Sequence, residues 1–140
     1  MPISKGFNHV ATLTTDCDRH AEWWGKVFGA TVTFQMEKRD DHPRMFILDV
    51  GGGAALNVFE VTQDEIIGEQ RRQGGRGAID HFAIAVDTRE ELEAVKQRLI
   101  DAGADIGEIQ QLGGDTWSLF FRDVDGMELE VCAPAQGNGA

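Results

Sequence analysis

The stretch Phe7-Asn8-His9-Val10-Ala11-Thr12-Leu13-Thr14 is echoed later in the chain by Ile79-Asp80-His81-Phe82-Ala83-Ile84-Ala85-Val86. Both stretches have the composition of a short β-strand, and each carries a histidine directly after a polar residue. His9 and His81 lie 72 positions apart, and Glu60 and Glu130 lie 70 positions apart. These matched spacings indicate an internal duplication in which each copy carries one histidine and one glutamate.

The residues after the first stretch predict one helix and three strands. Thr15-Asp16-Cys17-Asp18 offers helix N-cap side chains, and Gly29-Ala30 closes a helix that ends at Phe28. Trp24 falls at the helical spacing of a core residue, whereas His20 and His42 are expected to be exposed. The predicted strands that follow are Thr31–Met36, Met45–Val50 and Ala54–Val61.

The second copy repeats this order. Thr88-Arg89-Glu90-Glu91 has the spacing of a capping box and predicts a helix with a buried stripe. Gly103-Ala104 ends that helix as Gly29-Ala30 ends the first. The strands predicted after it are a weak one near Ile106–Gln110, then Thr116–Arg122 and Met127–Cys132.

The whole chain of 140 residues is predicted to be a single α+β domain, because a module of roughly 70 residues hardly buries a sufficient core alone. The domain, residues 1–140, consists of two paired βαβββ modules at about 6–61 and 78–133. The polar residues 62–77 read as a linker with a short helical turn around Glu65–Arg72, and residues 135–140 read as a flexible tail.

The charge of the chain excludes some partners. Its 13 Lys and Arg residues against 24 Asp and Glu residues give a net charge of −11, which repels nucleic acid and anionic membranes. No apolar run approaches the ~20 residues that span a bilayer, and the first residues lack the apolar region of a secretion signal. A cytoplasmic location is expected, with Cys17 and Cys132 reduced and too few to form a disulfide framework.

Strand alternation predicts where the polar side chains point. On strand 79–86 His81 lies opposite the face of Phe82 and Ile84, and on strand 127–132 Glu130 lies opposite the face of Leu129. His81 and Glu130 should therefore point away from the helix-covered face, together with Thr116, Ser118, Phe120 and Arg122. The first module is less clear, because Glu60 shares parity with Leu56 and Val58, and His9 with Ala11 and Leu13.

Each of the four residues alone is more often structural or solvated than a ligand. Two imidazoles and two carboxylates at duplicated positions, however, form a nitrogen and oxygen donor set that suits Zn, Ni, Co, Mn or Fe(II). The sequence therefore predicts one divalent metal ion per site.

Four motifs resemble the vicinal oxygen chelate superfamily, which comprises glyoxalases, bleomycin-resistance proteins and extradiol dioxygenases. They are Asn8-His9-Val10-Ala11, Val27-Phe28-Gly29-Ala30, Asp80-His81-Phe82-Ala83 and the run from Phe121 to Glu130, with Asp123-Val124-Asp125-Gly126 and Glu130 as its most specific part. The resemblance extends from about Phe7 to Cys132. It implies curled mixed sheets around a metal-binding cavity, and frequently a homodimer.

The resemblance also implies roles for residues. Its four ligand positions fall on His9, Glu60, His81 and Glu130, a set most like that of glyoxalase I, with methylmalonyl-CoA epimerase as a neighbour. The implied activity is a metal-dependent lyase or isomerase that stabilises an enediolate, with Glu130, or its counterpart Glu60, as the catalytic base. The substrate would be a small molecule with vicinal oxygens, although no arginine follows His9 to bind glutathione. The predicted substrate-binding residues are Asn57, Ser118, Phe120 and Arg122.

Two alternatives remain open at this stage. One is an Fe(II) or Mn(II) extradiol-type dioxygenase that uses His9, His81 and Glu130 and does not need Glu60. The other is a non-catalytic resistance protein that binds a drug or metabolite in an apolar cavity. Arg71, Arg72 and Arg76 could contact an anionic substrate, but a solvated linker explains them equally well.

Overall fold

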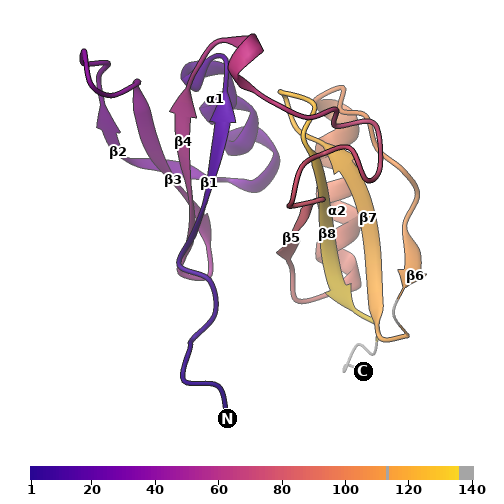
Figure 1. The fold of residues 1–140 in the computed structure, drawn as a ribbon. Helices are drawn as coiled ribbons and strands as arrows, with labels where there is room; N and C mark the ends of the chain where they lie inside the picture. Colours follow the sequence, from indigo (N-terminus) through magenta and orange to yellow (C-terminus); the bar gives the residue numbers. More distant parts are fainter. Residues whose placement is uncertain (113, 136–140) are drawn as a thin grey trace. The chain divides into compact units, whose positions relative to one another are not determined.

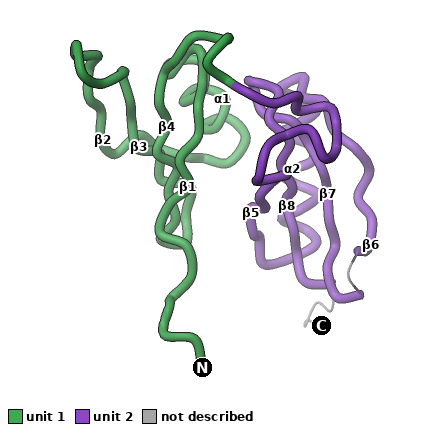
Figure 2. The backbone as a smooth tube through the Cα atoms, viewed as in Figure 1, with its two compact units in different colours: residues 1–66 green, residues 67–140 purple. Residues whose placement is uncertain are grey.

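The computed structural model describes residues 1–112 and 114–135, and these residues form two compact units (Figures 1 and 2). Unit 1 comprises Met1–Ile66 and unit 2 comprises Ile67–Ala140. The predicted tail lies, apart from Ala135, outside the described residues.

Unit 1 contains a four-stranded sheet with the order β1-β4-β3-β2. The outer strand β1 runs parallel to β4, and the other neighbours are antiparallel. Three successive glycines at positive φ, Gly51 to Gly53, make the tight connection between β3 and β4 that side chains with a Cβ would strain. The elements of unit 1 are β1 (His9–Thr14), α1 (Cys17–Phe28), β2 (Thr31–Met36), β3 (Met45–Gly51), β4 (Ala54–Glu60) and the 3-10 helix η1 (Gln63–Glu65).

The helix α1 begins and ends where the sequence predicts. The Asp16 side chain caps it by accepting a hydrogen bond from the backbone N–H of Arg19, and Gly29 ends it in the left-handed conformation. Trp24 is fully buried, as predicted. The predicted exposure of His20 is wrong, because its side chain is 1% exposed and packs between the rings of Trp24 and Phe46.

Unit 2 repeats the topology of unit 1. Its sheet has the order β5-β8-β7-β6, with β5 parallel to β8 and antiparallel pairing elsewhere. The capping box of Thr88 and Glu91 opens α2, whose buried leucines and valine pack against β7 and β8. The elements of unit 2 are β5 (Phe82–Ala85), α2 (Arg89–Asp101), β6 (Gln110–Leu112), β7 (Thr116–Arg122) and β8 (Glu128–Pro134).

Two four-stranded mixed sheets, each with its own α-helix, confirm the predicted fold class of paired βαβββ modules. Boundaries differ in two places. The predicted strand at Ile106–Gln110 is mostly loop, in which Ile106 forms an isolated bridge to Phe121, and β6 begins only at Gln110. The helical turn predicted at Glu65–Arg72 is instead a single 3-10 turn over Gln63–Glu65. None of the described helices is long and apolar enough to cross a membrane.

Candidate metal site

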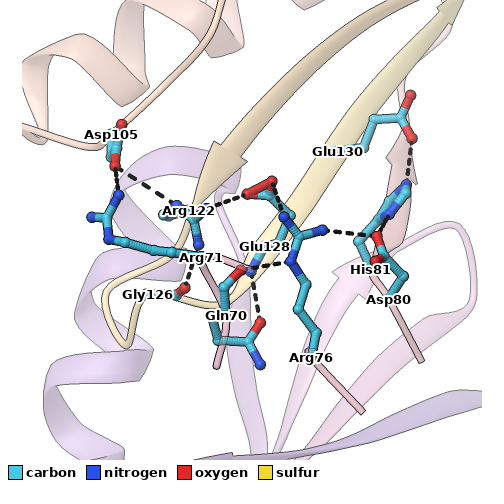
Figure 3. A network of polar contacts seen from close by, with 10 residues as sticks. All are labelled: Gln70, Arg71, Arg76, Asp80, His81, Asp105, Arg122, Gly126, Glu128 and Glu130. Atoms are coloured by element: carbon cyan, nitrogen blue, oxygen red, sulfur yellow. Dashed lines mark hydrogen bonds and ion pairs between the residues drawn. The ribbon is translucent and has the colours of Figure 1, made fainter. Parts of the chain in front are cut away.

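The open face of the unit 2 sheet carries His81 and Glu130 side by side. Leu129, Val131 and Ala133 of β8 are buried on the face that α2 covers, so Glu130 projects from the opposite face, as strand alternation predicts. His81 precedes β5, and the parallel register that pairs Ala83 with Glu130 places the two side chains within reach. His81 Nε2 lies 3.1 Å from Glu130 Oε1 (Figure 3).

Each member of this pair is held by a second partner. His81 Nδ1 lies 2.8 Å from Asp80 Oδ1, and the Ser118 hydroxyl donates a hydrogen bond to Glu130 Oε2. The ring of Phe120, the direct neighbour of Glu130 in the register, stands edge-on to the imidazole at 5.1 Å. These contacts fix the orientation of both side chains before any ligand arrives.

The electrostatics of the pair agree with its geometry. The hydrogen bond to Asp80 and the contact with Glu130 raise the pKa of His81 against the opposing effect of burial. Burial alone would raise the pKa of Glu130, but hydrogen bonds from Ser118, Cys132 and His81 together lower it. Both shifts favour the ion pair, and a metal ion would have to displace the proton between the two groups.

Cys132, two residues beyond Glu130 on the same face, is not an activated thiolate. Burial and the neighbouring Glu130 carboxylate raise the pKa of its thiol to about 12. Both Cys17 and Cys132 are free thiols. Their protonated state at neutral pH argues against a nucleophilic or thiolate-ligand role.

Unit 1 repeats part of this arrangement. His9 is exposed at the start of β1, and its Nδ1 lies 2.8 Å from the side-chain oxygen of Asn8. Asn8 thus stands to His9 as Asp80 stands to His81. If that amide oxygen accepts the Nδ1 proton, the Nε2 lone pair of His9 is available for a metal ion.

The structure does not bring Glu60 to His9 within unit 1. In the parallel register His9 pairs with Ala55, whereas Glu60 pairs with Thr14 at the other end of the strands. The five-residue offset corresponds to about 16 Å along a strand. Glu60 also shares its strand face with the buried Val58, and His9 lies on the opposite face.

The Glu60 carboxylate has a different function in the fold. It accepts a 2.8 Å hydrogen bond from the backbone N–H of Cys17 in the first turn of α1, and it lies 3.5 Å from the Arg44 guanidinium. It also lines a polar pocket of about 560 Å³ formed by unit 1 residues that include His42. This position stabilises the helix N-terminus and leaves Glu60 unsuited to act as a base beside His9.

Asn57 occupies the position in unit 1 that Glu130 occupies in unit 2. Ala11, two positions after His9, pairs with Asn57. Ala83, two positions after His81, pairs with Glu130. Asn57 was predicted as a substrate-binding residue, and the register instead aligns it with a ligand position. The fourth donor of a duplicated site would therefore be a neutral amide and not a carboxylate.

Two other predicted substrate contacts are already engaged within unit 2. Ser118 is fully buried and donates a hydrogen bond to Glu130. Arg122 shares the Glu130 face, but its guanidinium pairs with Glu128 and Asp105 and donates to the carbonyl of Gly126. The side chains of Ser118 and Arg122 are therefore bonded to other groups of unit 2, and Phe120 remains the predicted substrate contact.

The donor set fits a divalent metal ion. Metal–nitrogen and metal–oxygen bonds near 2.1 Å leave neighbouring ligand atoms of a six-coordinate ion roughly 3 Å apart, and His81 Nε2 and Glu130 Oε1 are separated by 3.1 Å. One side chain is neutral when deprotonated and the other anionic, as such ions require. Two preoriented donors on one sheet face leave further coordination positions for other ligands.

Comparison with known proteins identifies the class. Residues 6–131 match the Glyoxalase/Bleomycin resistance protein/Dioxygenase superfamily, and the chain belongs to this superfamily. The chain is 27% identical over 134 residues to "Putative ring-cleaving dioxygenase MhqA" of Bacillus subtilis, covering 96% of this chain and 42% of that protein. It is 28% identical over 97 residues to a "Trivalent organoarsenical cleaving enzyme" of a Bacillus species, covering 69% of this chain and 51% of that enzyme. The chain thus spans about half or less of the length of these curated relatives.

Solved structures show the same fold. A glyoxylase/bleomycin resistance protein/dioxygenase domain from Frankia superposes with a TM-score of 0.75 at 23% identity, covering 94% of this chain and 98% of that one. The fosfomycin resistance protein FosX of Listeria monocytogenes, solved with Mn(II) and sulfate, gives a TM-score of 0.69 at 17% identity and covers 94% of this chain and 91% of its own. The superfamily therefore includes enzymes and metal-binding members.

Proposed function

We propose that the chain is a divalent-metal-dependent enzyme whose ion is held by His9, His81 and Glu130 and whose substrate is a small molecule with vicinal oxygens. The observation that carries this proposal is the 3.1 Å approach of His81 Nε2 to Glu130 Oε1 on an open sheet face. His9, whose Nδ1 faces the side-chain oxygen of Asn8, is proposed as the third donor.

The reaction that the donor set supports best is oxygen-dependent ring cleavage of a catechol-like substrate. Two histidines and one carboxylate are the donors typical of non-haem Fe(II) enzymes that leave positions open for substrate and oxygen. A glyoxalase-type quartet depends on a second carboxylate, but Glu60 lies away from His9, and Asn57 stands at the position that matches Glu130. The similarity to a protein named as a ring-cleaving dioxygenase supports the same choice.

The protein's own residues would prepare the site. Asp80 holds the imidazole of His81 through Nδ1, and Ser118 holds Glu130 through Oε2. Phe120 offers an apolar ring edge beside the imidazole, which suits a planar substrate ring. When bound, a divalent ion would supply Lewis-acid polarisation of vicinal substrate oxygens and, as iron, redox chemistry with oxygen.

A glyoxalase I-type lyase or isomerase is the second candidate. It is favoured by one observation, the Glu130 carboxylate beside His81 Nε2, which could accept a proton next to the substrate position even though its lowered pKa makes it a weaker base than an ordinary glutamate. Such an enzyme would need to work with an amide at Asn57 in place of a second carboxylate.

Metal analysis followed by two activity assays tests the proposal. Purified wild type reconstituted with Fe(II) or Mn(II) should retain about one ion per site, and His81→Ala should not. Oxygen uptake with a catechol supports ring cleavage, and isomerisation of a hemithioacetal without oxygen uptake supports the second candidate. Absence of metal from wild type and His81→Ala alike would refute the proposed metal-dependent activity. Tight ligand binding that survives a chelator would point to a non-catalytic binding protein.

A further inference from the structure

The segment between the two modules contains one arginine that differs from its neighbours. The side chain of Arg71 is 71% exposed and pairs with Asp105 on the surface. Arg76 is 10% exposed, although it belongs to the same glycine-rich stretch that reads as a solvated linker. A guanidinium so deeply covered needs fixed partners, since an unpaired buried charge is costly.

Arg76 has three such partners, all within unit 2 (Figure 3). Its Nη1 lies 2.8 Å from Asp80 Oδ1, its Nη2 lies 3.4 Å from Glu128 Oε2, and its Nε donates to the carbonyl of Gln70. The Gln70 side-chain oxygen in turn accepts a hydrogen bond from the backbone N–H of Glu128. The segment is thus docked on the start of β8.

The two carboxylates that Arg76 bridges flank the candidate ligands. Asp80 is the residue directly before His81 and accepts from its Nδ1. Glu128 lies two residues before Glu130 on the same face of β8. One guanidinium therefore joins the approach to β5 to the first residue of β8, and these are the two places from which the donors of unit 2 project.

We infer that Arg76 is a positioning residue of the metal site, acting through Asp80 on the imidazole of His81; this inference rests on the proposed metal-dependent function. The same Asp80 oxygen meets both the guanidinium and the imidazole, so Arg76 fixes the carboxylate that holds the Nδ1 proton. Proton retention on Nδ1 leaves Nε2 as the donor atom. Arg76 also neutralises the carboxylates of Asp80 and Glu128, which would otherwise crowd one edge with negative charge beside Glu130.

The test compares Arg76→Gln with the matched control Arg71→Gln, using Mn(II) alone as the probe in competition with a chromophoric chelator. Loss of an outer-shell partner typically weakens metal binding by about 10–100-fold, and this loss is expected for Arg76→Gln and not for Arg71→Gln. Arg76→Lys, which keeps the charge but cannot span both carboxylates, should recover part of the loss. Asp80→Asn should lower the affinity similarly, and the double variant Arg76→Gln with Asp80→Asn should be little worse than either single variant.

A second measurement separates positioning from a general effect on folding. Nitrogen NMR of the metal-free protein above the His81 pKa should show the Nδ1-protonated tautomer in wild type and a shift towards the other tautomer in Arg76→Gln. Equal Mn(II) affinities of Arg76→Gln and Arg71→Gln would overturn the inference. An unchanged His81 tautomer in folded Arg76→Gln would also overturn the inference. If Arg76→Gln does not fold, the same comparison is made with Arg76→Lys. If wild type binds no metal, the proposed function fails, and the tautomer signal alone decides whether Arg76 positions His81.

Discussion

Unit 1 and unit 2 place a histidine at the same point of the same topology, but they surround it with different groups. In unit 2 His81 meets Asp80, Glu130 and, through Asp80, the buried Arg76. In unit 1 His9 meets the neutral Asn8, and the register sets Asn57 where unit 2 has Glu130. The two units share the backbone position of the histidine and differ in the charge around it.

This difference suggests that the two units contribute differently to the proposed metal site. In the proposed function, the anionic carboxylate and its charged support come from unit 2, whereas the residue of unit 1 proposed as a donor is a neutral histidine beside an amide. Neutral second-shell partners raise ligand basicity less than carboxylates do. The ion is therefore expected to depend more on the donors of unit 2 than on those of unit 1.

The largest expected effect comes from removing the carboxylate that only one half supplies at this position. Glu130→Gln should weaken Mn(II) binding by more than about 100-fold, beyond the range typical for outer-shell partners. Asn57→Ala, at the matching position of unit 1, should weaken it far less. Chelator competition measures both, and equal losses for the two variants would contradict the asymmetry between the units.

A converse substitution would make unit 1 resemble unit 2. Asn57→Glu adds a carboxylate at the position aligned with Glu130 and completes a quartet of two histidines and two glutamates. Mn(II) binding should tighten, by roughly tenfold if the added donor contributes as much as a typical outer-shell partner. Oxygen uptake with a catechol should fall, since one open coordination position is taken. A decrease in Mn(II) affinity would show that the two positions are not functionally equivalent.

Glu60→Gln should affect stability and leave metal binding unchanged. The carboxylate stabilises the first turn of α1 through Cys17 and contacts Arg44, and loss of its charge should lower the free energy of unfolding by about 1 kcal/mol. Urea denaturation measures this cost. A hundredfold loss of Mn(II) affinity in Glu60→Gln would restore Glu60 as a ligand and contradict the register.

The smallest expected effect is a pH dependence of the metal-free protein. The pKa of His81 is raised above its ordinary value of 6.5 by Asp80 and then by Glu130. Protonated His81 therefore adds to the free energy of unfolding. This stabilisation is complete below pH 6.5 and is lost as the pH rises through the raised pKa. Asp80→Asn, which gives unit 2 the neutral partner of unit 1, should remove most of it. Unfolding free energies between pH 5.5 and 8.5 should change by on the order of 1 kcal/mol more in wild type than in the variant. An identical pH profile for the two proteins would contradict the role of Asp80.

Much of this site could be predicted from single strands. Strand alternation alone places Glu130 opposite Leu129, and the structure confirms that face. The separation of Glu60 from His9 could not be predicted for a related reason. Alternation fixes faces within a strand, but it does not fix the register between β1 and β4, and one residue of slip exchanges the faces. The equivalence of Asn57 and Glu130 could have been found by matching the strand pairs of the two units instead of matching their glutamates.

Other features left little signal in the sequence. Arg76 lies among glycines and polar residues that are typical of a linker, and its burial depends on partners in β8 that are far along the chain. His20 is polar and lies on a helix, yet the packing of Trp24 and Phe46 around it is a property of the folded unit. Both cases depend on tertiary contacts that local patterns do not encode.

The parallel pairing at the edge of each sheet has a consequence for folding. The edge strands β1 and β5 pair with the final strands of their units, β4 and β8, so each sheet joins the chain segments that are most distant in sequence within it. Contacts of long sequence separation form late, because loop closure must first be overcome. During synthesis almost the whole of unit 2 must therefore emerge before Glu130 can reach His81, and this pair is expected to form in the last folding step of the unit.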